Sequence, residues 1–178
     1  MTADTPPAIE YGGQADPDEV ALAVERYLEI RNRLDRDGGD WGELAEVLTD
    51  DAVYVDCAWG RTEGKAAIAE FLRTAMVGID FTNPVDFWAA DGPRVLVKWR
   101  QVLPGRRSDG SRAQQSAVTT LLYAGDGRFR YVEDLLNVAH CVEDIISSGW
   151  QAGPGFHAPP ENPDRNFDPN PTSRRLDI

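Results

Sequence analysis

The stretch DDAVYVDCAWGRTEG, residues 50–64, reads as a β-strand that runs into a turn. Because side chains alternate between the two faces of a strand, Val53 and Val55 fall on one face, while Tyr54 and Asp56 fall on the other. Aspartate is depleted in strands, so its place beside a tyrosine needs surroundings that favour a carboxyl group. We therefore expect the face that carries Tyr54 and Asp56 to line a site.

The segments on both sides of this strand have apolar residues at helical spacing, and the segments farther along the chain alternate as strands do. Residues 17–37 carry an apolar stripe at helical spacing, with Asp16 placed as the N-cap. A short helix is expected over 41–48 and a longer one over 64–78. Period-two segments separated by turns, followed by a closing helix at 137–147, then predict four strands: 84–90, 93–103, 112–124 and 127–136. This order indicates an α+β fold, a cone-shaped curved antiparallel sheet wrapped around the N-terminal helices with a pocket at its open end.

The composition divides the chain into three parts. Residues 1–16 are rich in Pro, Gly and Asp and are expected to be flexible, and residues 17–150 form one α+β domain. Residues 151–178 are Pro-rich and have no period, which predicts an extended C-terminal tail. This tail is either solvated or a strap across a neighbouring subunit or the pocket mouth. Three aromatic residues are candidate anchors for a strap: Trp150, Phe156 and Phe167.

Charge and motifs exclude several classes of function. The net charge of −12 disfavours binding to nucleic acid and to anionic membranes. Neither a P-loop nor a dinucleotide fingerprint is present, and the two histidines lie far apart, so no cofactor and no metal site are predicted. Cys57 and Cys141 form neither a disulfide framework nor a CxxC pair. With no signal peptide and no apolar run of about 20 residues, a cytoplasmic protein is expected.

Two stretches carry a resemblance to a known superfamily. RYLEI, residues 26–30, and LTDDAVYVDCAWGRTEGKAAIAEFL, residues 48–72, together with the order of elements, resemble the nuclear transport factor 2-like superfamily. It includes ketosteroid isomerases, SnoaL-type polyketide cyclases, limonene-epoxide hydrolases and scytalone dehydratase. The resemblance covers about residues 20–147. It implies the curved-sheet fold, and it implies candidate site residues through two of the member families.

The resemblance to ketosteroid isomerases implies three roles. The carboxylate near the end of the first strand is the general base in that family, and it corresponds to Asp56. The helical tyrosine that donates a hydrogen bond to the developing oxyanion corresponds to Tyr27. Thr119 takes the place of the acid that is the second oxyanion donor.

The resemblance to limonene-epoxide hydrolases implies a further set. Their Tyr-x-Asn motif corresponds to Tyr54 and Asp56, and their last-strand aspartate corresponds to Asp134. Trp99 and Gln101 stand where that family has an Arg and an Asp. The cyclases also use an aspartate late in the sheet, for which Asp134 is the candidate.

These residues describe an aromatic pocket with few polar groups, which suits a small hydrophobic ligand. The catalytic candidates are Asp56, Tyr27 and Asp134, and the substrate-binding candidates are Tyr54, Trp59, Trp99, Gln101 and Thr119. The expected function is a cofactor-independent isomerase, cyclase or hydratase for a steroid- or polyketide-like carbonyl compound. A carboxylate in such a pocket has a raised pKa, which suits a general base.

Other interpretations of the same residues remain open. The domain could be a non-catalytic module for ligand binding or dimerisation, and a homodimer through an exposed sheet face is expected. Lys98 and Arg100 beside Leu96 give that face a mixed surface. Asp56 could simply accept backbone N–H groups at a strand end, and Asp134 could cap the closing helix.

Overall fold

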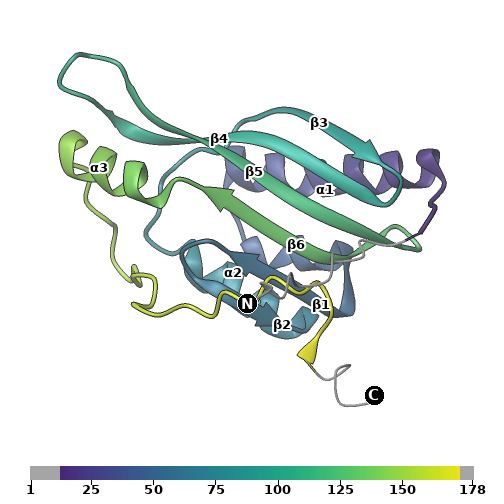
Figure 1. The fold of residues 1–178 in the computed structure, drawn as a ribbon. Coiled ribbons are helices and arrows are strands. Elements are labelled where there is room, and N and C mark those ends of the chain that lie inside the picture. The colour runs from purple at the N-terminus through teal and green to yellow at the C-terminus, as the bar shows by residue number, and fades with distance from the viewer. Residues whose placement is uncertain (1–12, 173–178) are drawn as a thin grey trace, which may run out of the picture.

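The structure, a computed structural model, describes residues 13–172. It has an N-terminal helical layer, a sheet and a third helix beyond the sheet (Figure 1). In chain order the elements are α1 (Pro17–Asp37), the 3₁₀ helix η1 (Trp41–Val47), β1 (Leu48–Asp56), β2 (Gly60–Glu63), α2 (Lys65–Ala75), β3 (Val85–Asp91), β4 (Arg94–Arg106), β5 (Arg112–Gly125), β6 (Arg128–Leu136) and α3 (Val138–Ser148).

The six strands form one sheet in the order β2-β1-β6-β5-β4-β3. The predicted α+β class and the curved sheet around the N-terminal helices are confirmed (Figure 1). Strands β3 to β6 form the expected antiparallel meander, whereas β1 pairs with β6 in parallel, which makes the sheet mixed. The parallel pair places Asp56 directly beside Asp134.

Helix α1 packs its apolar stripe against the concave face of the sheet. The side chain of Asp16 caps its start by accepting from the backbone N–H of Asp18 at 2.9 Å. Gly38, with φ of 74°, ends it by donating its N–H to the carbonyl of Leu34. The stripe buries apolar residues and also one charged residue, Arg31, which is 4% exposed.

The alternation expected in β1 is confirmed. Tyr54 joins the main core between the sheet and the helices. Val53 and Val55 point to the opposite face, where they form a small cluster with Leu122 and Tyr131. Strand β1 therefore separates a packed outer face from an inner face that carries the polar candidates.

Residues 150–172, here called the C-terminal strap, continue from α3, and their later part runs along the outer side of β1 and β2 (Figure 1). The guanidinium of Arg61 on β2, with its side chain only 3% exposed, donates to strap carbonyls at 2.6–2.9 Å. Tyr131 donates to the carbonyl of Phe167 at 3.3 Å, so the strap covers the outer cluster. Three strap carbonyls accept from Arg61: those of Asn166, Asp168 and Asn170.

Gly60 allows the strap to approach the β1–β2 hairpin closely. Its φ is 86°, and a Cβ atom there would lie 2.8 Å from the backbone of Asp164. The flexible segment expected over residues 1–16 and the last six residues of the predicted tail lie largely outside the described residues. Within residues 13–172, no helix is both long enough and apolar enough to cross a membrane.

Candidate active site

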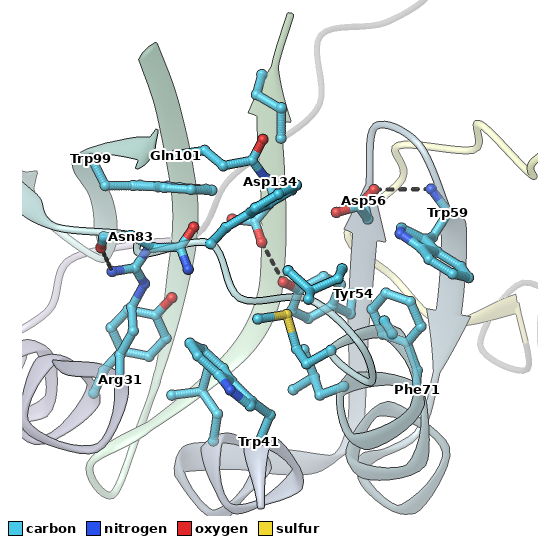
Figure 2. A pocket seen from close by; sticks show the side chains of 18 residues that line it. Arg31, Trp41, Tyr54, Asp56, Trp59, Phe71, Asn83, Trp99, Gln101 and Asp134 are labelled. Atoms are coloured by element: carbon cyan, nitrogen blue, oxygen red, sulfur yellow. Dashed lines mark hydrogen bonds between the residues drawn. The ribbon is translucent and has the colours of Figure 1, made fainter. Parts of the chain in front are cut away.

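A cavity of about 130 Å³ lies between the concave face of the sheet and helices α1, η1 and α2 (Figure 2). Cavities of ~150 Å³ hold a molecule the size of benzene, so this chamber fits one six-membered ring. Eighteen residues line it, most of them apolar or aromatic. Among them, three carry a charged group: Arg31, Asp56 and Asp134.

Asp56 ends β1 at the wall of the cavity. Its Oδ1 accepts from the backbone N–H of Ala58 at 2.7 Å and of Trp59 at 2.9 Å. Asp56 therefore does accept backbone N–H groups at the strand end, but with one carboxyl oxygen only. Its Oδ2 makes no hydrogen bond within residues 13–172. Removal from water, together with the negative charge of Asp134, raises the pKa of Asp56 to about 6, against the effect of the two N–H groups.

Asp134 lies on β6 in register with Asp56 and accepts hydrogen bonds at both of its oxygens. Oδ2 accepts from the hydroxyl of Tyr54, and Oδ1 accepts from the hydroxyl of Thr119. Thr119 in turn accepts from the indole N–H of Trp99 at 2.9 Å. Burial raises the pKa of Asp134, while these hydroxyls and the charge of Arg31 oppose that rise. Asn137 caps α3, so the capping role considered for Asp134 falls to it.

The two cavity tyrosines remain protonated at neutral pH. Burial raises the pKa of Tyr27 to about 12, with the charge of Arg31 acting in the opposite direction. Burial and the charge of Asp134 raise the pKa of Tyr54 well above its usual range. The Tyr54 hydroxyl already donates its hydrogen bond to Asp134, so Tyr27 is the better placed of the two to donate to a ligand.

Arg31 is the functional candidate that the sequence analysis did not select. Its Nη1 donates to the carbonyl of Asn83 at 2.6 Å, and its guanidinium lies 4.8 Å from the centre of the Trp99 ring. Asn83 is itself held by Asp35, which accepts from its backbone N–H at 2.6 Å. These contacts fix a buried cation at the wall of the cavity (Figure 2). Its charge acts on Tyr27 and on Asp134, which also line the cavity.

Aromatic rings close the side of the cavity opposite Arg31. The Phe71 ring of α2 lies 5.4 Å from that of Tyr54 and 6.1 Å from that of Trp59. Trp41 of η1 faces the same space (Figure 2). Flat apolar walls of this kind suit a ring compound.

The structure brings the predicted residues together. Seven line the cavity: Tyr27, Tyr54, Asp56, Trp59, Trp99, Gln101 and Asp134. Thr119 does not line it but is a hydrogen-bond partner of Asp134, so a direct contact between Thr119 and substrate stays a prediction. Thr119 is 1% exposed, and its hydroxyl contacts both the Trp99 indole and the Asp134 carboxyl group. Within residues 13–172, no three His, Cys, Asp or Glu side chains are grouped to hold a metal ion.

A family model of the SnoaL-like domain matches residues 24–132, which is more than half of the chain. The chain belongs to the SnoaL-like domain family. The match begins within α1, takes in all of β1 to β5, and ends within β6. No protein of curated function matches the sequence.

Solved structures share the SnoaL-like fold at low identity. A proposed SnoaL-like polyketide cyclase from Jannaschia sp. CCS1 is 18% identical, with a TM-score of 0.56 over 79% of this chain and 100% of that one. An epoxide hydrolase from M. tuberculosis, similar to limonene-epoxide hydrolases, is 23% identical, with a TM-score of 0.56 over 74% of this chain and 92% of that one. The expected SnoaL-like membership is confirmed by the family match, and at these identities the likeness to the solved structures shows the fold alone.

Proposed function

We propose that this SnoaL-like protein is a cofactor-independent enzyme that removes a proton beside the carbonyl group of a small hydrophobic compound, with Asp56 as the general base. The observation that carries the proposal is the state of Asp56. It stands at the wall of an aromatic cavity with one oxygen unengaged and a pKa raised to about 6. A carboxylate tuned in this way is an effective base near neutral pH.

The charges in the cavity suit this step. Asp56 Oδ2 takes the proton from the carbon next to the carbonyl, and the electrons of that C–H bond move onto the carbonyl oxygen as an enolate. Tyr27 donates its hydroxyl proton in a hydrogen bond to this oxygen, and Arg31 supplies the compensating positive charge. Return of the proton to a different carbon gives isomerisation, and attack of the enolate on a second carbonyl gives cyclisation.

Asp134 acts here as a positioning residue. Its two hydrogen bonds fix the hydroxyls of Tyr54 and Thr119, and its charge contributes to the raised pKa of Asp56. The Tyr54 ring then forms a rigid wall beside the reacting carbon. This arrangement differs from one in which Asp134 itself exchanges a proton with the substrate, because both of its oxygens are engaged.

Exchange of α-protons tests the proposal without knowledge of the natural substrate. In D₂O near pH 7, we expect the protein to accelerate deuterium incorporation at the α-carbons of cyclohexanone, followed by NMR. Cyclohexanone matches the one-ring size of the cavity. Exchange at the rate of buffer alone, with the ketone shown to bind, would support the alternative of a non-catalytic ligand-binding module. Trp99 and Gln101, where epoxide hydrolases have Arg and Asp, favour that alternative.

A homodimer through the sheet is a second proposal. The strap already covers the outer face of β1 and β6, which leaves the outer face of β3 to β5 for a partner. Phe87 and Leu96 are 56% and 40% exposed on this face. We expect a dimer in sedimentation at micromolar concentration and a monomer for Phe87→Glu. Leu22→Glu, at a 66% exposed position on α1, is the matched control and should leave the dimer intact.

A further inference from the structure

A second chamber of about 180 Å³ adjoins the cavity. The two spaces share lining residues, among them Asp56, Trp59 and Gln101, so the proposed base borders both of them. Apart from Asp56, no charged side chain lines the second chamber within the described residues. It is an apolar space that the proposed reaction does not use.

The outer wall of this chamber comes from a part of the chain that the family match does not include. Ile145 and Val142 of α3 line it, together with Trp150 and Phe156 of the strap. All four follow residue 132, where the match to the SnoaL-like domain ends. In Figure 1, α3 and the first part of the strap lie beyond the end of β6. The outer wall of the chamber therefore lies outside the part of the chain that the family model matches.

The contacts of the strap make this wall a fixed one. The indole N–H of Trp150 donates to Asp80 at 2.6 Å, and its ring lies 4.7 Å from that of Phe81. Phe156 packs edge-on against Trp150 at 6.3 Å. The backbone N–H of Gly153 donates to the carbonyl of Gly78 at 2.8 Å.

Position 78 is a glycine, which allows the strap backbone at Gly153 to approach the domain closely. A Cβ there would lie 2.7 Å from the carbonyl oxygen of Gly153, and its φ is 72°. Three kinds of contact thus hold the strap against the domain at one place: a side-chain hydrogen bond, tilted and edge-on contacts between aromatic rings, and a backbone hydrogen bond. The wall of the second chamber is therefore held in place by specific contacts between the strap and the domain.

We infer that the substrate is a two-part molecule, a cyclic ketone with an apolar chain or second ring system, whose ring occupies the inner cavity and whose apolar part occupies the chamber under α3 and the strap. The inference rests on the proposed function of the inner cavity. The carbonyl lies inward, where Tyr27 and Arg31 are, and the reacting carbon lies at the boundary, where Asp56 is. Beyond the shared residues Asp56 and Gln101, the apolar part contacts mostly apolar walls, and burial of its surface there stabilises binding.

A series of 4-alkylcyclohexanones, from cyclohexanone to the hexyl compound, tests this inference by calorimetric measurement of affinity. We expect each added methylene to raise the affinity about fourfold until the chamber is full. Ile145→Trp fills the chamber, so 4-hexylcyclohexanone should lose at least about tenfold in affinity, while cyclohexanone binds as before. Ile146→Trp is the matched control, because Ile146 is the next residue on α3 and is 76% exposed.

A second pair of variants tests the strap side of the chamber. Phe156→Ala removes part of the wall and should lower the affinity for 4-hexylcyclohexanone about tenfold, whereas Phe167→Ala, farther along the strap, should leave it unchanged. The inference is overturned if affinity does not depend on chain length, or if both members of each pair behave alike. Asp56→Asn should keep the dependence on chain length, so a failure of the proposed chemistry is distinguishable from a failure of this inference.

Discussion

Asp56→Asn should lower the rate of α-proton exchange by about 10³-fold, because the variant has no group that can accept the proton. The amide oxygen can still accept the backbone N–H groups of Ala58 and Trp59, so the fold should persist. The measurement is deuterium incorporation into cyclohexanone by NMR. Asp50→Asn, at an exposed position of the same strand, is the matched control and should retain the wild-type rate. Equal rates for wild type and Asp56→Asn would remove Asp56 from the proposed mechanism.

The raised pKa of Asp56 predicts how the exchange rate depends on pH. The base must be ionised, so the exchange rate should be level above a pH of about 6 and fall tenfold per pH unit below it. A profile with its inflection near the ordinary carboxyl value of 3.8 would mean that the cavity does not tune this group.

The raised pKa of Asp56 also has a consequence for stability. The folded state binds this proton more tightly than the unfolded chain, so stability is full below pH 3.8 and is lost as the pH rises to about 6. The loss amounts to at most about 3 kcal/mol. We expect Asp56→Asn to be more stable than wild type at pH 8 and equal to it near pH 3.5, measured by denaturant unfolding. A variant that is less stable than wild type at pH 8 would contradict this account of the pKa.

Local patterns predicted the inner face of the site because they depend on one element at a time. The period of two in β1 put Tyr54 and Asp56 on one face, and the helical spacing of α1 put Tyr27 on the stripe that meets the sheet. The position of Asp134 needed the resemblance to known families, since only the pairing of β1 with β6 places it beside Asp56. The sequence of neither strand alone indicates that two strands so far apart in the chain pair in parallel.

The features that the sequence analysis missed depend on contacts between distant segments. β2 has four residues directly after a turn, too few to display a period, and its pairing becomes visible only through the hairpin with β1. A strap was one of two alternatives for the C-terminal tail, with Trp150 among its candidate anchors, but the Arg61 guanidinium and the backbone groups that also hold it give no sequence pattern. Arg31 did carry a signal, a charged residue within the apolar stripe of α1, one turn after Tyr27.

Replacing Arg31 should have the second largest effect on catalysis. We expect Arg31→Gln to lower the exchange rate by about 10²- to 10³-fold, the usual effect of removing one stabilising group from a developing oxyanion. The positive charge of Arg31 acts on the enolate and not on the neutral ketone, so the loss should appear in kcat with little change in KM. Arg31→Lys keeps the positive charge, but lysine lacks the planar group that both stacks on Trp99 and donates to Asn83. Its exchange rate should therefore lie between those of the wild type and Arg31→Gln.

The matched control for Arg31 is Arg33→Gln. Arg33 is on the same helix, and its side chain is 43% exposed. It pairs with Glu43 at 2.6 Å, and an exposed ion pair of this kind contributes little to stability. Because removing Arg31 also leaves the carbonyl of Asn83 unpaired, near-ultraviolet circular dichroism must show a folded variant before rates are compared. A folded Arg31→Gln that exchanges α-protons at the wild-type rate would leave Tyr27 as the donor to the enolate oxygen and reduce Arg31 to a support for Trp99. A loss in kcat that Arg31→Lys partly restores would instead identify the positive charge itself as what stabilises the enolate.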